Sequence, residues 1–214
     1  MKLKKFPQSC VLLQAGKTKI LIDPATTKYD PKFFEDWQTA DAVLVTHRHS
    51  DHINPEVLKK LGKPIYSTGE VKKYNPELYI KIIKQGDTFK IGDIKVEVVK
   101  AVHGFISAKA EIFENVGFIL DDGKTRLYIT SDTVRFNNNY KADVLFCDVT
   151  AYEASMGLWG ACQTAKDVGA RLLVVAHQDA GETFYEKEKI EQYLNEQNMT
   201  FVRPSTGDEL KLGE

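Results

Sequence analysis

Four side chains that can bind a metal ion occupy six consecutive positions, as His47, His49, Asp51 and His52. They follow the apolar, β-branched run 42–46, which predicts a strand that ends at this motif. Because side chains alternate along an extended chain, the first three can converge on one point while His52 faces another. The motif therefore predicts metal binding, with two adjacent centres served by one loop.

The other ligand-type residues also follow predicted strands. His103, Asp132 and His177 each come directly after an apolar or alternating stretch. Loops at strand ends are where open α/β sheets carry chemistry. Taken singly, such a histidine or aspartate is more often a surface or turn group. The neighbouring motif reverses that preference and favours one shared site.

The pattern along the chain predicts mixed strands and helices. Strands are expected over 9–14, 18–23, 42–46, 116–120, 125–130, 144–149 and 171–176, with further strands inside 78–102. One helix is predicted after Asn54 and ends at Gly62, and a second spans 159–168. A last helix is predicted to begin at Thr183, with Glu186 completing a capping box. This order predicts α/β layers that enclose sheet.

Length and composition favour a single domain over residues 1–214, because 43% of the residues are hydrophobic and no linker divides the chain. The net charge of −1 gives no reason to expect nucleic acid as a partner. No apolar run of transmembrane or signal-peptide length is present. The scattered cysteines, Cys10, Cys147 and Cys162, are expected to be reduced core thiols of a cytoplasmic protein.

In this pattern the chain resembles the metallo-β-lactamase superfamily, whose H-x-H-x-D-H signature it contains. The residues that carry the resemblance are Asp23, His47, His49, Asp51, His52, His103, Asp132 and His177. The resemblance extends from about residue 9 to the C-terminus and implies an α/β fold, the αββα four-layer sandwich built from two similar halves. Short internal echoes at 40–44 and 142–145 agree with duplicated halves.

The resemblance also implies a division of the ligands between two metal ions. One ion would be held by His47, His49 and His103. The second would be held by Asp51, His52 and His177, with Asp132 bridging both. Such a nitrogen and oxygen site suits Zn²⁺ and also Mn²⁺ or iron. We expect a hydroxide between the metals to act as nucleophile, oriented by Asp51 as the catalytic residue.

The expected activity is metal-dependent hydrolysis of an ester, lactone or phosphodiester bond in a small, anionic substrate. An alternative from another class is a mononuclear-iron oxidoreductase of the persulfide dioxygenase type. A nucleic-acid-binding or nucleic-acid-processing member of the fold is the other alternative, disfavoured by the near-neutral charge. Flavodiiron chemistry is disfavoured because those relatives carry a glutamate where this chain has His49. Assembly as a homo-oligomer is left open.

Two arginines are candidate substrate contacts. Arg48 lies inside the signature and Arg135 follows Asp132 by three positions, although exposed charge or a structural salt bridge is the more common role. Phe105 and Trp159 could line a pocket beside the metals, although aromatic residues at such places are more often core.

Overall fold

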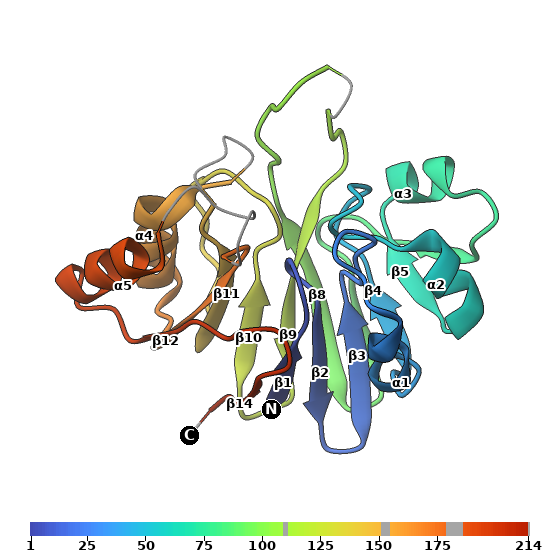
Figure 1. Ribbon diagram of the computed structural model, residues 1–214, viewed down its shortest axis with the longest axis horizontal. Helices are drawn as coiled ribbons and strands as arrows, with labels where there is room; N and C mark the ends of the chain where they lie inside the picture. Colours follow the sequence, from blue (N-terminus) through green and yellow to red (C-terminus); the bar gives the residue numbers. More distant parts are fainter. Residues whose placement is uncertain (109–110, 151–154, 179–185, 214) are drawn as a thin grey trace.

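Two seven-stranded sheets lie face to face, and helices cover their outer sides (Figure 1). The computed structural model describes residues 1–108, 111–150, 155–178 and 186–213. Apolar side chains fill three layers, one between the sheets and one between each sheet and its helices. The αββα four-layer sandwich that the resemblance implies is confirmed.

The first sheet is built mainly from the first part of the chain. Its strands, in spatial order, are β14 (Glu209–Lys211), β1 (Lys2–Lys5), β2 (Val11–Ala15), β3 (Thr18–Ile22), β4 (Ala42–Leu44), β5 (Ile65–Ser67) and β6 (Ile80–Ile82). From β14 to β3 neighbours are antiparallel, and from β3 to β6 they are parallel. The predicted opening hairpin is confirmed as β2 and β3, with Gly16 at a φ of 57° in its turn.

The second sheet repeats this arrangement. Its strands, in the corresponding order, are β7 (Thr88–Ile91), β8 (Ile94–Lys100), β9 (Val116–Asp121), β10 (Arg126–Ile129), β11 (Val144–Asp148), β12 (Leu172–Ala176) and β13 (Phe201–Val202). From β7 to β10 neighbours are antiparallel, and from β10 to β13 they are parallel. In each sheet the pairing of neighbouring strands therefore changes from antiparallel to parallel at the fourth strand, as expected for two similar halves.

The internal sequence echoes mark equivalent positions in these halves. Before β4, the Asp41 carboxylate accepts a hydrogen bond of 2.8 Å from the Lys19 backbone N–H, and the Asp41 N–H donates to the Lys19 carbonyl. Before β11, Asp143 makes the same pair of bonds with Arg126, at 2.7 Å for the carboxylate. Each aspartate thus fixes the backbone position at which the following strand begins. That strand, β4 or β11, is the first in its sheet to pair in parallel with its neighbour.

The helices divide between the two outer faces. They are the 3₁₀ helix η1 (Pro31–Phe33) and the α-helices α1 (Phe34–Trp37), α2 (Pro55–Leu61), α3 (Gly69–Tyr74), α4 (Gly157–Val168) and α5 (Lys187–Glu196). The first four pack on the first sheet, and α4 and α5 pack on the second. Within the described residues, no helix combines the length and apolar character needed to cross a membrane.

The predicted helix boundaries are confirmed in part. Asn54 caps α2 by accepting from the Val57 N–H at 3.1 Å, and Gly62 ends it in a left-handed conformation. The start of α4 lies at Gly157, two residues before the predicted one. The predicted start at Thr183 lies outside the described residues. Because α5 begins at Lys187, Glu186 precedes its first turn and the predicted capping box is wrong.

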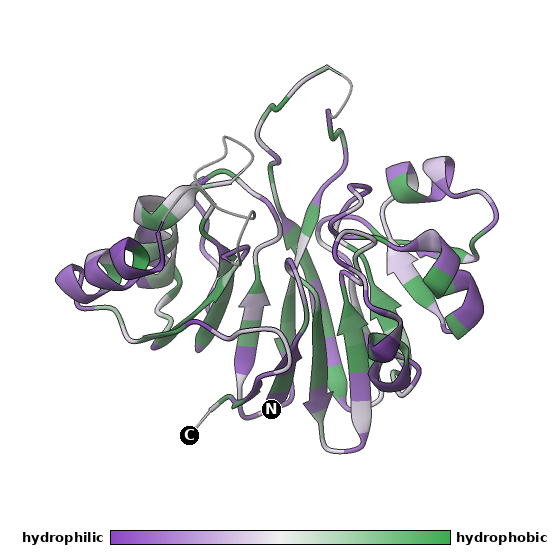
Figure 2. Cartoon of the chain, in the orientation of Figure 1, coloured by the Kyte–Doolittle hydropathy of each residue, from purple (hydrophilic) through white to green (hydrophobic). Residues whose placement is uncertain are grey.

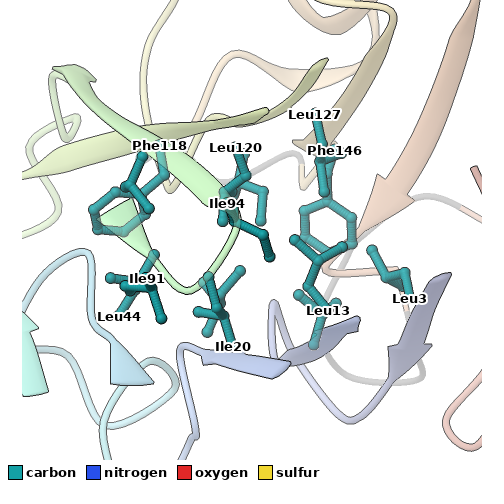
Figure 3. Close-up of a cluster of buried hydrophobic side chains, with 14 of the residues drawn as sticks. Leu3, Leu13, Ile20, Leu44, Ile91, Ile94, Phe118, Leu120, Leu127 and Phe146 are labelled. Carbon is teal, nitrogen blue, oxygen red and sulfur yellow. The ribbon is translucent and has the colours of Figure 1, made fainter. Parts of the chain in front are cut away.

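The largest apolar layer lies between the sheets, where Phe118 and Phe146 face Leu13 and Ile20 (Figure 3). All four side chains are buried. Hydrophobic residues run along the facing strands, whereas α5 is mostly hydrophilic on its outer side (Figure 2). The three cysteines are buried and unpaired, which confirms them as core thiols.

Removing the Phe118 ring should destabilise this layer strongly. We expect Phe118→Ala to lower the free energy of unfolding by about 3–5 kcal/mol, because the cavity cannot collapse between two sheets. Urea unfolding measures this change, with Tyr79→Ala as the control because Tyr79 is 81% exposed. A loss no larger than that of the control would contradict the packing of Phe118 between the two sheets.

Candidate metal centre

The predicted ligands all follow strands and gather at one edge of the paired sheets. His47 to His52 follow β4, His103 follows β8, Asp132 follows β10 and His177 follows β12. The seven side chains form two groups, and within each group the potential ligand atoms lie within 4.8 Å of one another. Sequence reasoning thus identified a set of side chains that the fold brings together.

The first group contains His47, His49 and His103. Nε2 of His47 and Nδ1 of His49 are 3.2 Å apart, and both rings meet the His103 ring edge-on. The Nδ1–H of His103 donates to the Gly104 carbonyl at 2.7 Å, which leaves Nε2 as the lone-pair nitrogen. That Nε2 is buried and has no hydrogen-bond partner among the described residues. Three imidazole nitrogens that converge, one of which has no hydrogen-bond partner among the described residues, fit a divalent ion.

The second group contains Asp51, His52, Asp132 and His177. Nε2 of His52 lies 3.3 Å from Nε2 of His177 and 3.2 Å from Oδ1 of Asp132. The His177 Nε2 lies 3.5 Å from the same Asp132 oxygen. Asp51 is half-buried, whereas the other three members are buried. Two imidazoles and two carboxylates at one point also fit a divalent ion.

Asp23 fixes the orientation of His52. Its Oδ2 accepts from the Nδ1–H of His52 at 2.8 Å and from the Thr46 hydroxyl at 2.9 Å, and its Oδ1 accepts from the Thr46 N–H. These bonds direct Nε2 of His52 toward His177 and Asp132. A carboxylate on the far nitrogen of a ligand histidine fixes both the tautomer and the ring orientation.

Charge in the second group is balanced between carboxylates and imidazoles. Burial acts to lower the pKa of His52, but the Asp132 and Asp23 carboxylates outweigh it and hold that pKa well above its usual value. Burial acts to raise the pKa of Asp132, but His52 and His177 hold it well below its usual value. The buried Asp23 and Asp132 carboxylates therefore favour the protonated form of His52.

The first group has the opposite electrostatic character. Burial, together with the neighbouring His52, holds the pKa of His47 well below its usual value. Burial also lowers the pKa of His103. These imidazoles are therefore neutral near pH 7, the state in which histidine binds a metal ion.

Left-handed backbone conformations occur at several of the strand ends that carry the site. The φ angles are +48° at Asp23, +63° at Ser131 and +47° at His177. Residues other than glycine adopt such angles rarely, and sites of function are where they concentrate. Each turn redirects the chain where a strand ends and brings a ligand-type side chain into the centre.

The four candidate substrate residues lie outside the two groups. Arg48 pairs with Glu70 at 2.9 Å, and Arg135 pairs with Asp167 at 2.7 Å while its guanidinium lies 5.5 Å from the Trp159 ring centroid. Both guanidinium groups are thus engaged within the chain, and substrate contact by either stays a prediction. Phe105 and Trp159 are 61% and 58% exposed, so the alternative that they belong to the core is wrong.

Sequence reasoning missed two polar residues of the centre. Asn115 accepts from the Ser131 hydroxyl and donates to the Asp132 carbonyl, so it fixes the turn before Asp132. Asp148 is a buried acid at the end of β11, and burial raises its pKa to about 7. Its position in the otherwise apolar run 144–149 was the signal available in the sequence.

Comparison with known proteins supports this assignment of the fold. The β-lactamase superfamily domain matches residues 2–177, a range that includes all seven predicted ligands. The UPF0173 metal-dependent hydrolase of Nanoarchaeum equitans is 30% identical over 145 residues, which cover 64% of this chain and 63% of the relative. Over the first curated relatives, the chain spans only 60% to 64% of their length.

Two solved structures share the fold over nearly the whole chain. Igni18, a metallo hydrolase from Ignicoccus hospitalis, superposes with a TM-score of 0.81 at 20% identity and covers 98% of this chain and 97% of its own. The metallo-β-lactamase fold protein YhfI from Bacillus subtilis gives 0.78 at 17% identity and covers 98% of each chain. At these identities the likeness establishes the fold alone.

The Asp23–His52 pair predicts a pH-dependent contribution to stability in the metal-free protein. Because the folded pKa of His52 is raised, this contribution is complete below the unfolded value of about 6.5 and is lost as pH rises through the folded value. We expect Asp23→Asn to lower the free energy of unfolding by about 3–5 kcal/mol near pH 6 and by less near pH 9. Urea unfolding at both pH values measures the difference.

The control for this measurement is Asp36→Asn, which disrupts the surface ion pair with Lys4. A surface pair contributes at most about 1 kcal/mol. An Asp23→Asn loss that is equal at both pH values would contradict a charged His52.

Proposed function

Since the chain belongs to the β-lactamase superfamily, we propose that it is a metal-dependent hydrolase with a dinuclear centre. The observation that carries the proposal is the convergence of five imidazoles and two carboxylates in two adjacent groups. Curated relatives named metal-dependent hydrolases support the same activity. One ion would be held by His47, His49 and His103, and the other by Asp51, His52 and His177, with Asp132 between them.

We propose Zn²⁺ as the native metal, with Mn²⁺ or iron as the alternatives. The donor set consists of imidazole nitrogen and carboxylate oxygen without thiolate, and all three cysteines are buried core residues. When bound, two divalent ions supply Lewis acidity toward a substrate oxygen and lower the pKa of a water molecule toward neutrality. Hydrolysis then requires no serine, cysteine or lysine nucleophile.

The side chains of the centre have separate tasks in this proposal. Asp51 orients the attacking water and accepts its proton, because it is the half-buried member of the second group and the others face one another. Asp23 keeps the proton of His52 on Nδ1, so that Nε2 remains a ligand atom. The side-chain amide of Asn115 donates to the backbone carbonyl of Asp132 and so holds the backbone there.

The proposed substrate is a small molecule with an ester, lactone or phosphodiester bond and an anionic group. Arg135 is the proposed contact for the anion, since among the described residues only its Nη2 pairs with a carboxylate, that of Asp167. Phe105, two residues after His103, and Trp159, whose ring centroid lies 5.5 Å from the Arg135 guanidinium, are exposed and are the proposed contacts for the apolar part of a substrate. A cytoplasmic location is part of the same proposal.

Loss of single ligands should abolish activity without unfolding the protein. We expect His47→Ala and Asp51→Asn to lower kcat/KM by at least about 100-fold, because each removes a ligand or the proton acceptor. Hydrolysis of a phosphodiester, a lactone and a thioester is measured on protein whose bound metal has been counted by mass spectrometry. Circular dichroism confirms that the variants are folded.

The matched control is Asp36→Asn, the same change at a carboxylate that pairs with Lys4 at the surface and belongs to neither ligand group. Full hydrolysis by metal-depleted protein would exclude the proposed activity. One iron per chain, together with oxygen consumption, would instead identify an oxidoreductase.

Arg135 provides a test of the anionic substrate. We expect Arg135→Ala to raise KM for a phosphorylated substrate by roughly tenfold with little change in kcat, because it removes binding that is equal in the ground and transition states. The control substrate is the corresponding uncharged ester, for which KM should stay the same. An unchanged KM for the phosphorylated substrate would remove Arg135 from the substrate site.

A further inference from the structure

On either side of residues 109–110, the segment between β8 and β9 extends beyond the ends of the sheets (Figure 1), and it carries His103 of the first ligand group. We call the described residues 103–108 and 111–115 the arm. His103 begins the arm, and exposed apolar side chains follow at Phe105 and Ile106. On the His103 side the chain is fixed by the Val102 N–H, which donates to the Thr133 hydroxyl at 2.7 Å. The returning side of the arm is fixed in a different way.

Glu70, the second residue of α3, accepts three hydrogen bonds. Its Oε2 accepts from the backbone N–H groups of Phe113 and Glu114 at 3.0 and 2.9 Å. Its Oε1 accepts from Nε of Arg48 at 2.9 Å. The residue is only 7% exposed, so these bonds are made largely out of water. Glu70 therefore joins the arm to the metal-binding signature.

Two further contacts complete the connection. The Glu70 N–H donates to Oε2 of Glu114 at 2.7 Å, so each glutamate accepts from the backbone of the other. Nη2 of Arg48 donates to the Glu111 carbonyl, and the guanidinium lies 4.5 Å from the Tyr74 ring centroid. We call Arg48, Glu70 and Glu114 the clasp.

We propose that the clasp positions the three histidines of the first group. Arg48 stands between His47 and His49 in the sequence, and the arm that the clasp holds begins at His103. The two segments that supply these histidines are thus tied together through α3. The inference rests on the proposed metal centre, and it gives Arg48 a positioning role in place of the substrate contact expected from its place in the signature.

The geometry of the clasp requires a carboxylate at position 70. A carboxylate accepts all three bonds, whereas a glutamine amide has one acceptor oxygen and would turn an NH₂ group toward a donor. Lysine at position 48 could reach Glu70. Its single ammonium group could not also donate to the Glu111 carbonyl, as the planar guanidinium of arginine does with a second nitrogen. Glu70→Gln and Arg48→Lys therefore weaken the clasp with little change in side-chain size.

Hydrogen exchange tests the clasp independently of metal binding. We expect Glu70→Gln to speed exchange of the Phe113 and Glu114 amides at least about tenfold, because their acceptor is weakened. Amides within β8 and β9 should exchange as in the wild type. Arg48→Lys should act in the same direction with a smaller effect, and it decides the test if Glu70→Gln does not fold.

Binding of Co²⁺ tests the effect on the histidines. We expect both variants to raise the dissociation constant of one Co²⁺ ion by about 10- to 100-fold, as is usual when a group that orients ligands is lost. The other ion should bind within about twofold of the wild type. The absorption spectrum of the His103→Ala variant identifies which ion belongs to the first group.

The matched control is Glu111→Gln, because Arg48 uses only the carbonyl of that residue. It should leave both amide exchange and Co²⁺ binding unchanged. Unchanged exchange in the clasp variants, or equal weakening of both ions, would overturn the positioning role. If the wild type binds no Co²⁺, the proposed metal centre fails, whereas the exchange measurement still decides whether the clasp holds the arm.

Discussion

The buried carboxylate of Asp23 is the interaction on which the rest of the centre depends. It follows β3, bonds both Thr46 after β4 and the ring of His52, and has no exposure to water. A buried charge is tolerated only when it is paired and hydrogen-bonded. Because the buried Asp23 carboxylate must keep its hydrogen bonds to Thr46 and His52, it fixes the ends of β3 and β4. It also fixes the direction of the His52 ring.

The sequence was sufficient to predict which side chains converge, because they follow strands whose carboxyl ends meet at one edge. The signature at His47 to His52 is local, and the later ligands follow long apolar strands that are easily recognised. Short elements such as α1, α3 and β5 were not predicted, since elements of this length are stabilised by packing rather than by their own pattern. Glu70 escaped notice because its burial is created by tertiary contacts, whereas Asp148 was marked in the sequence by its place in an otherwise apolar run.

The two halves of the fold contribute unequally to one function. Both use an aspartate, Asp41 or Asp143, to set the first parallel crossover. The first half supplies the four-residue signature, whereas the second supplies single ligands from three different strands. Neither half contains a complete group of ligands, so the centre exists only where the two sheets meet.

The pairing of β14 with β1 has a consequence for how the chain reaches this state. Lys2 lies opposite Lys211, so the first sheet keeps an open edge until the last strand arrives. Contacts between such distant residues slow folding, and an unpaired strand edge invites association with other chains. During synthesis on the ribosome, β1 would expose this edge until residues 209–211 emerge and pair with it, and in that interval the edge is open to association with other chains.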